Sequence, residues 1–321
     1  MSAAKTPVII SIKTPFYPIP STYDMRKLHP MESIPMLEAY ADALRREIEN
    51  AAEDYADCRV EAIRIGGGIA GHAFDEQLGA LLWDMHTWYD IAPDCEIALE
   101  VHPGMVSVET LNACRRGKVT TLCVDYATSD PFESEAMGRF LPPSAMDTTK
   151  MILANAPLRL SFDLMLGLPG QSCASLDQTL EKADAYGAAE IVLHPLRLIP
   201  GTVFADKQAE GYAASTSPRK HLPNEKERTA LWQSADKWFY AHGYEMLIPG
   251  RYARRGCTSL FHQLLVENCA LLGFGAGAHT RMDGIEAVNT SDLDTYIRYS
   301  PDPAKLVEKA WPIPGAPQDA E

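Results

Sequence analysis

The sequence predicts an α/β protein built on parallel strands, with a smaller α+β extension at the C-terminal end. From residue 8 to residue 196, short apolar runs alternate with longer amphipathic stretches. The connections between them are short, which favours parallel strands joined by right-handed crossovers. After Pro200 the alternation stops and the chain becomes polar and rich in proline and glycine. These observations predict a strand–helix repeat followed by a second, different unit.

Six strands are expected, most of them followed by a helix. Their apolar runs are continuous, as in strands that are buried on both faces. The expected strands are 8–12, 60–65, 97–101, 119–124, 158–166 and 191–196, and the expected helices are 31–55, 74–89, 108–114 and 174–186. Six units are fewer than the eight of a closed barrel. Periodicity alone therefore leaves an open barrel and a doubly wound sheet as alternatives.

The part after Pro200 is predicted to contain a loop at 207–223, a helix at 225–242 and a glycine-rich apolar segment at 271–279. The tail from Pro312 carries three prolines and a glycine and ends in acidic residues, so we expect it to be disordered. We divide the chain into a strand–helix unit at 1–200, a second unit at 201–311 and a tail at 312–321.

Composition narrows the class of protein. The chain has 321 residues, of which 46% are hydrophobic and 22% charged, which is ordinary for a globular protein with a sizeable core. A net charge of −14 disfavours general nucleic-acid binding, although Arg251, Arg254 and Arg255 could form a local basic patch. No apolar run is long enough to span a bilayer, and the N-terminal run at 8–12 is too short for a signal peptide. We therefore expect a cytoplasmic protein.

The seven cysteines show no spacing typical of a metal site. No two of them lie within eight positions of each other, and no CxxC pattern occurs. An odd number of thiols in a reducing compartment does not indicate a disulfide framework. The simplest interpretation is a set of scattered free thiols, mostly buried.

Candidate ligand-binding residues lie where parallel strands end, because ligands bind at that edge of such sheets. Gly66, Gly67 and Gly68 follow the second strand and let backbone amides approach a carboxylate or phosphate. Glu100 ends the third strand, and Asp163 lies within the apolar fifth strand, where a carboxylate needs hydrogen-bond donors. The alternative for the three glycines is a tight turn without a ligand. The alternative for Glu100 and Asp163 is a pairing with other side chains that is purely structural. Arg139 could meet a carboxylate or lie at the surface.

These residues belong to a series of short motifs in a recognisable order. The series comprises Pro15-Phe16, the triple glycine, Glu100 before Pro103, 136–139, 163–171, 200–202, 243–245, 253–256, His262-Gln263 and 273–279. It resembles the oxygen-independent coproporphyrinogen III oxidase family of the radical S-adenosylmethionine superfamily, together with its heme-chaperone and heme-degrading relatives. The resemblance covers roughly residues 8 to 300, and 163–171 and 273–279 are its most specific parts.

The resemblance implies a partial (β/α)6 barrel of the radical S-adenosylmethionine type with a C-terminal extension. It also implies a [4Fe-4S] cluster held by three cysteines in a CxxxCxxC loop just after Pro15-Phe16. In this sequence the three positions are Tyr17, Ser21 and Asp24, with the spacing intact and all three thiols replaced. Iron–sulfur clusters are held by thiolates, for which oxygen ligands do not substitute. We therefore predict that the cluster is absent.

The implied S-adenosylmethionine pocket is only partly kept. Glu100, Arg139 and Asp163 match family positions that contact this cofactor, and Gly66 to Gly68 match the loop that binds its amino group. Three other positions depart from the family pattern: Ser11, Ile69 and Asp125. The resemblance leaves S-adenosylmethionine open as a ligand, although loss of the cluster iron would remove one of its anchors.

His262-Gln263 lies where some relatives carry a His-Asn motif that binds heme, and imidazole is a common axial ligand of heme iron. An ordinary helix histidine is the alternative, and His279 faces a similar choice. Tyr17, Tyr23 and Tyr126 could stack against a flat macrocycle or simply pack in the core. Heme therefore stays open as a second ligand.

Three functional hypotheses remain from the sequence. The first is a non-catalytic descendant that binds a small molecule, such as a tetrapyrrole, or a protein partner. The second is a non-radical enzyme or metal site that uses the strand-end carboxylates Asp24, Glu100, Asp125 and Asp163. The third is a protein that still acts as a family oxidoreductase with cysteines borrowed from elsewhere in the chain.

Overall fold

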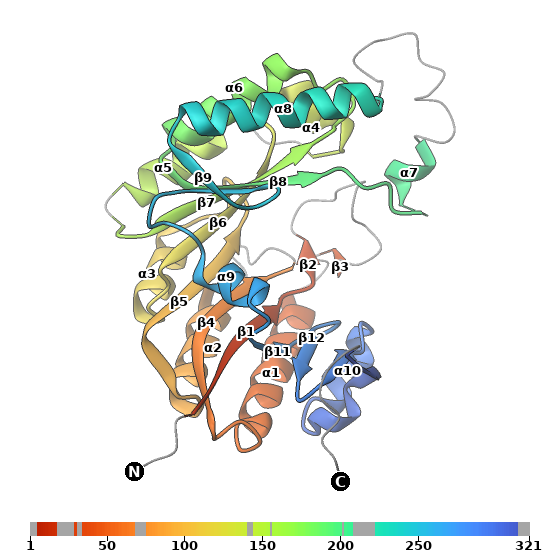
Figure 1. Ribbon diagram of the computed structural model, residues 1–321. Helices are drawn as coiled ribbons and strands as arrows, with labels where there is room; N and C mark the ends of the chain where they lie inside the picture. Colours follow the sequence, from red (N-terminus) through yellow and green to blue (C-terminus); the bar gives the residue numbers. More distant parts are fainter. Residues whose placement is uncertain are drawn as a thin grey trace.

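The computed structural model describes residues 5–17, 29–30, 34–67, 75–139, 144–154, 156–200, 202–207 and 222–313. They form one 12-stranded sheet in the order β14-β13-β12-β11-β1-β4-β5-β6-β7-β8-β10-β9, with a separate pair of short strands, β2 (Phe16–Tyr17) and β3 (His29–Pro30). Figure 1 shows the strand direction turning steadily across the sheet. Within the described ranges the edge strands β14 and β9 are not hydrogen-bonded to each other, so the sheet is open.

Six parallel strands lie side by side in chain order at the centre of the sheet. They are β1 (Thr6–Lys13), β4 (Cys58–Gly66), β5 (Ile91–Val101), β6 (Thr121–Ala127), β7 (Arg159–Leu166) and β8 (Ala188–Pro195). All five pairings between them are parallel. The predicted α/β class and all six predicted strands are confirmed, with β4 and β5 longer than expected.

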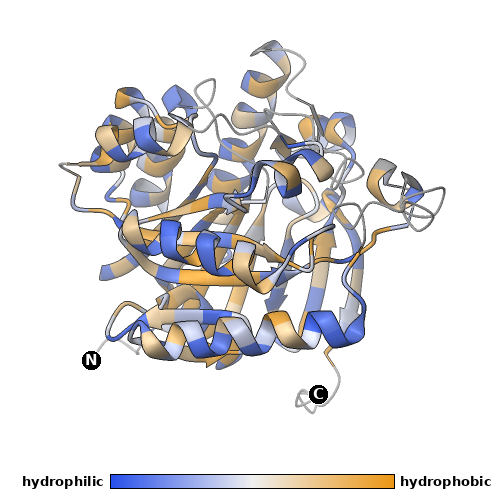
Figure 2. Ribbon diagram, turned by 90° about the horizontal axis from the view of Figure 1, so that it is seen from above, coloured by the Kyte–Doolittle hydropathy of each residue, from blue (hydrophilic) through white to orange (hydrophobic). Residues whose placement is uncertain are grey.

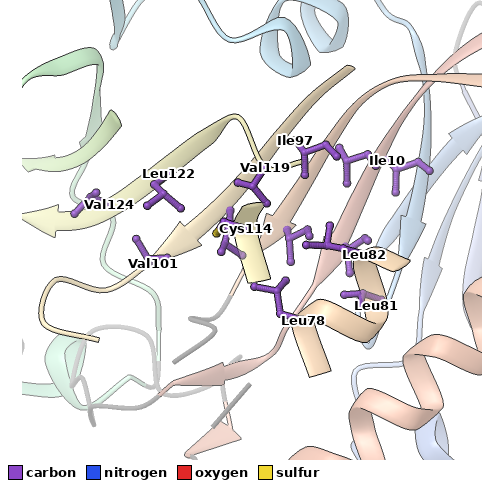
Figure 3. Packing of buried hydrophobic residues seen from close by; sticks show 14 of the residues in the cluster. Ile10, Leu78, Leu81, Leu82, Ile97, Val101, Cys114, Val119, Leu122 and Val124 are labelled. Atoms are coloured by element: carbon purple, nitrogen blue, oxygen red, sulfur yellow. The ribbon is translucent and has the colours of Figure 1, made fainter. Parts of the chain in front are cut away.

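Helices connect these strands and cover one face of the sheet, which we call the outer face. They are α1 (Ile34–Ala51), α2 (Asp75–Trp88), α3 (Val108–Arg116), α4 (Pro131–Ala136), α5 (Ser144–Leu153) and α6 (Cys173–Ala185). Figure 3 shows α2 and α3 packing on the strands through buried residues such as Leu78, Leu82 and Cys114. In Figure 2 blue and orange segments alternate along the enclosing helices, as expected for helices that bury one side. The sequence had not predicted α4 and α5.

The strands carry different side chains on their two faces, because successive residues of a strand point in opposite directions. Apolar residues such as Ile63, Leu99 and Phe162 belong to the main core on the outer face. Alternate positions place charged and polar side chains on the opposite, inner face. These are Arg64, Glu96, Glu100, Cys123, Asp125, Ser161, Asp163, Glu190 and His194. The expectation of strands that are apolar on both faces therefore fails at the inner face.

The chain after residue 200 adds strands at both edges of the sheet. After α7 (Val203–Lys207) and α8 (Glu225–Ala241), the hairpin β9 (Tyr244–Ile248) and β10 (Arg251–Arg254) pairs antiparallel with β8. The chain then crosses the inner face as α9 (Leu260–Val266), and β11 (Ala270–Phe274) joins β1 in parallel. The remaining elements are β12 (His279–Met282), β13 (Ile285–Asn289), α10 (Leu293–Tyr299), a 3-10 turn (Pro303–Lys305) and β14 (Val307–Pro312).

Of these elements, the sequence had predicted only α8 and the apolar segment that contains β11. β14 includes Pro312, the first residue of the predicted tail, whereas 314–321 lie outside the described residues. The predicted loop at 207–223 lies mostly outside them as well. The division of the chain at residue 200 remains our proposal. None of the helices in the described ranges is long and apolar enough to cross a membrane.

The glycine-rich segment after β11 is shaped by close backbone contacts. Gly275 has φ +105°, and a Cβ there would lie 2.6 Å from the carbonyl oxygen of Lys13. The Gly275 N–H donates to the buried carboxylate of Glu47 on α1, at 2.8 Å, and Lys13 Nζ donates to the Gly277 carbonyl at 2.6 Å. Only glycine fits at position 275, so this motif fastens the C-terminal strands to β1 and α1.

The other specific motif, 163–171, closes on itself through Gln171. The side-chain carbonyl of Gln171 accepts from Gly167 N at 2.6 Å, and its amide donates to the Met165 carbonyl at 3.0 Å. The same amide reaches Glu133 of α4 at 3.3 Å. The motif therefore holds the turn between β7 and α6 against α4.

Candidate functional site

Arg64 of β4 lies at the centre of the inner face and contacts acidic or polar groups on three neighbouring strands. Its Nη2 lies 2.5 Å from Glu100 Oε1 on β5 and 3.6 Å from Asp163 Oδ2 on β7. Its Nη1 donates to Cys123 Sγ on β6 at 3.3 Å. Burial opposes the charge of Arg64, but Cys123, Glu100 and Asp163 together raise its pKa well above the ordinary value. Arg64 is therefore a charged guanidinium that links β4 to β5, β6 and β7.

Glu100 uses both of its carboxylate oxygens within the protein. Oε1 accepts from Nε and Nη2 of Arg64, and Oε2 accepts from the backbone N–H of Gly67 at 2.6 Å. A Cβ on Gly66 would lie 2.2 Å from the Glu100 carboxyl carbon. The Glu100 side chain therefore packs against Gly66 and accepts a hydrogen bond from Gly67. Gly68 lies outside the described residues.

Asp163 of β7 is paired with His194 at the end of β8, where Nε2 and Oδ1 lie 3.0 Å apart. Burial alone would raise the pKa of Asp163. The hydrogen bond from His194 and the charge of Arg64 outweigh burial and lower the pKa to about 2. Asp163 is therefore ionised at neutral pH, with Arg64 of β4 and His194 of β8 as its partners.

Two further arginines are paired with inner-face carboxylates. Arg139 Nη1 lies 2.8 Å from Asp125 Oδ1, so the arginine meets a carboxylate and is mostly enclosed. Arg251 of β10 lies 2.9 Å from Glu190 Oε1 of β8, and both side chains are buried. Arg251 does not contribute to the possible basic patch with Arg254 and Arg255, because the β9–β10 hairpin carries it onto the inner face beside β8.

His262 lies on α9, on the same face of the sheet (Figure 1). Its Nδ1 is 3.0 Å from Ser259 Oγ, the hydroxyl that begins the helix. Burial, assisted by the positive charges of Arg64 and Arg251, lowers the pKa of His262 to about 2. The imidazole is therefore neutral at physiological pH, which is the form that ligates metals. The helix that carries His262 packs on β4, the strand of Arg64.

The position of α9 is fixed by Glu96, a buried residue near the middle of β5. Glu96 Oε2 accepts from the Ser259 hydroxyl at 3.1 Å and from the Phe261 N–H at 2.9 Å. Phe261 packs against Ile9 and Ala62 on the inner face. These contacts with Glu96 hold α9, and with it His262, on the inner face.

The structure thus brings together most of the residues expected from the sequence, including Glu100, Asp163 and His262. Arg139 lies on the same face but pairs with Asp125. Tyr126 does not face the site, because it is on the outer face and packs against Phe162 and Tyr186. Ser21, Tyr23, Asp24, Ile69 and the side chain of Tyr17 lie outside the described residues.

Sequence reasoning missed Arg64, His194 and Glu190 as members of the site. Arg64 and Gly66 are two positions apart on one strand, so period-2 alternation could have placed them on one face. His194 lies within the predicted sixth strand, at the edge where ligands bind. No local signal revealed the Glu190–Arg251 pair, because it depends on the antiparallel return of β10 to β8.

The alternative of a metal site is not supported by the residues that the structure describes. Among them, no group of three histidine, cysteine, aspartate or glutamate side chains could hold a metal ion. The seven cysteines are all free thiols, and four of them are buried. No set of borrowed thiols is therefore assembled in the described ranges.

Curated proteins with similar sequences are heme-related or radical S-adenosylmethionine proteins. The heme chaperone HemW of Bacillus subtilis is 27% identical over 278 residues, which cover 86% of this chain and 70% of the relative. The anaerobilin synthase of Escherichia coli O157:H7 is 23% identical over 261 residues, covering 80% of this chain and 57% of the relative. The chain thus spans little more than half the length of one of these relatives. A scan against protein-family models finds no match.

A solved structure with the same fold is that of the coproporphyrinogen III oxidase HemN from Escherichia coli, a radical SAM enzyme. It superposes with a TM-score of 0.81 over 97% of this chain and 73% of that protein, at 17% sequence identity. The predicted radical S-adenosylmethionine type of fold is therefore confirmed, together with the expected extension after the six strands.

Proposed function

We propose that this relative of the HemW- and HemN-type radical S-adenosylmethionine proteins binds a tetrapyrrole on its inner face and performs no radical chemistry. The two parts of the proposal rest on different residues. The first rests on His262, and the second on the replaced thiols at 17, 21 and 24.

The chemistry of the donor set argues against a [4Fe-4S] cluster. Tyr17, Ser21 and Asp24 offer a phenol, an alcohol and a carboxylate, all of them hard oxygen donors. A cluster is held by soft thiolates, which are also deprotonated more readily than a phenol or an alcohol. The residues present do not fit the cluster, and without it no electron source remains for cleaving S-adenosylmethionine.

The observation that carries the binding proposal is the neutral imidazole of His262 on the inner face. Because Nδ1 lies beside the Ser259 hydroxyl, Nε2 is the nitrogen left for an axial bond to iron. Burial, assisted by the positive charges of Arg64 and Arg251, keeps the pKa of His262 low, so the imidazole has a free lone pair at neutral pH. A relative named heme chaperone and another named anaerobilin synthase add support from comparison.

Heme titration tests the binding proposal. Wild-type protein is expected to shift the heme Soret band on saturable binding. His262→Ala should weaken binding by at least about tenfold, or ~1.4 kcal/mol, because the axial bond is lost.

His279→Ala is the matched control, since His279 is half-exposed and pairs with Glu286 away from the site. Equal binding by the two variants would reject His262 as the ligand. No saturable shift with wild-type protein would reject tetrapyrrole binding altogether.

A further inference from the structure

The Arg64 guanidinium lies between two carboxylates that come from different strands. Glu100 accepts two hydrogen bonds from it, at 3.1 and 2.5 Å, and Asp163 lies 3.6 Å away. The three side chains are only 14–21% exposed. Water therefore screens them poorly, and each charge depends on the others for compensation.

The backbone next to this cluster is also in contact with the cluster's own side chains. The Gly67 N–H already donates to Glu100, and the carboxyl group of Glu100 fills the space beside Gly66. Asp163 has His194 as a second partner, at 3.0 Å. Arg64 thus supplies a cation to the two carboxylates, and Glu100 supplies an acceptor to the Gly67 N–H.

S-adenosylmethionine carries a sulfonium and an ammonium, both cations. To reach Glu100 or Asp163, either group would have to displace Arg64 or lie beside it. Displacement would leave a guanidinium without its partners in a largely enclosed site, and close approach of a second cation would be repulsive. The residues present therefore do not fit the cofactor that the fold family implies.

We propose that Arg64 is a specificity-determining residue whose guanidinium fills the cation position between Glu100 and Asp163, so that the site rejects cationic ligands such as S-adenosylmethionine. The inference does not depend on tetrapyrrole binding, because it concerns a different group and a different ligand. Exclusion of S-adenosylmethionine by Arg64 would prevent radical chemistry even if the loop at 17–24 held a cluster.

Removing the guanidinium should open the site to an external cation. We expect wild-type protein to show no binding of S-adenosylmethionine by equilibrium dialysis and no shift in melting temperature with the cofactor or with methylguanidinium. Arg64→Ala leaves both carboxylates without their shared cation. Its melting temperature should fall, and methylguanidinium should raise it again in a dose-dependent, saturable manner.

Arg64→Ala should also gain measurable binding of S-adenosylmethionine, by tenfold or more over wild type. Arg64→Lys, which keeps the charge, should remain insensitive to both probes. Arg45→Ala is the matched control, because Arg45 also pairs closely with a carboxylate, Asp84, but on the helices of the outer face. It should not be rescued by methylguanidinium.

If Arg64→Ala does not fold, as judged by circular dichroism, Arg64→Met keeps most of the aliphatic bulk and takes its place in both assays. Binding of S-adenosylmethionine by wild-type protein at an affinity unchanged in the Arg64 variant would overturn the proposal. So would a folded Arg64 variant that responds to neither probe. The heme titration uses other residues, so it can fail or succeed independently.

Discussion

Replacing Glu47 by alanine is expected to lower the free energy of unfolding by about 3–5 kcal/mol, since it strips the acceptor from three buried donors. Glu47 lies on α1 and is 3% exposed. Its carboxylate accepts from Gly275 N at 2.8 Å, from Asn289 Nδ2 at 2.6 Å and from the Tyr296 hydroxyl. These donors belong to the chain after residue 270, so the variant should loosen the C-terminal strands and α10 from α1.

The pH dependence of stability gives this prediction a second readout. Burial raises the pKa of Glu47 from 4.5 to about 7, although the three donors oppose the shift. The folded protein thus holds this proton more tightly than the unfolded chain. Between pH 4.5 and about 7 the contribution of Glu47 to stability therefore falls as the pH rises, and it is constant above that range.

Urea denaturation at several pH values measures both effects. Glu47→Gln should flatten the pH dependence in this window, because glutamine does not titrate. Glu49→Ala is the control, since Glu49 is exposed on the same helix. If Glu47→Ala lowered the free energy of unfolding by less than about 1 kcal/mol, the hydrogen bonds of Glu47 would not be what holds the C-terminal strands and α10 to α1.

Arg251→Met is expected to cost about 3–5 kcal/mol of stability, because it leaves the Glu190 carboxylate buried without a counter-charge. Arg251 and Glu190 are 8% and 5% exposed, and Glu190 also accepts from the Ser161 hydroxyl at 3.2 Å. The pair joins β10 to β8, so its loss should also weaken docking of the β9–β10 hairpin.

A double-mutant cycle separates the pair from the cost of each change. Arg251→Met combined with Glu190→Leu should recover at least half of the lost stability, since no unpaired charge then remains. Arg255→Ala, at a nearby exposed position, should change stability by less than about 0.5 kcal/mol. Additive losses in the double variant would mean that the two side chains are not energetically coupled.

The sequence predicted the central sheet well because each of its six strands has a local apolar signal. Apolar positions such as Ile10, Ile63 and Phe162 all pack into the one core on the outer face. The later antiparallel strands are short, and β14 is exposed at every residue. Their pairing is set by contacts distant in the chain, which no local pattern encodes.

The sequence identified several residues of the site but not the residues with which they pair. Glu100 and Asp163 were identified from their places on strands, yet their partner Arg64 was missed because it reads locally as one polar residue in an apolar run. The pairing of Arg251 with Glu190 was not predicted, because the return of β10 to β8 is not visible in sequence. Partners on the inner face depend on strand register, which emerges only in three dimensions.

The motifs shared with the family have internal roles in this chain. Gln171 closes the turn after β7, and Gly275 gives Glu47 its backbone donor. Both contacts hold the scaffold together and need no cofactor. The three positions where the resemblance implies cluster thiols carry Tyr17, Ser21 and Asp24 instead. This contrast supports the proposal that the chain keeps the fold without the radical reaction.

Anaerobic reconstitution with iron and sulfide tests the central claim most directly. The proteins to compare are wild type and the variant that restores the thiols, Tyr17→Cys with Ser21→Cys and Asp24→Cys. The account predicts that wild type gains no cluster absorbance and no acid-labile sulfide, whereas the restored variant gains both. A wild-type protein that emerges brown, with stoichiometric sulfide and 5′-deoxyadenosine among its products, would contradict it.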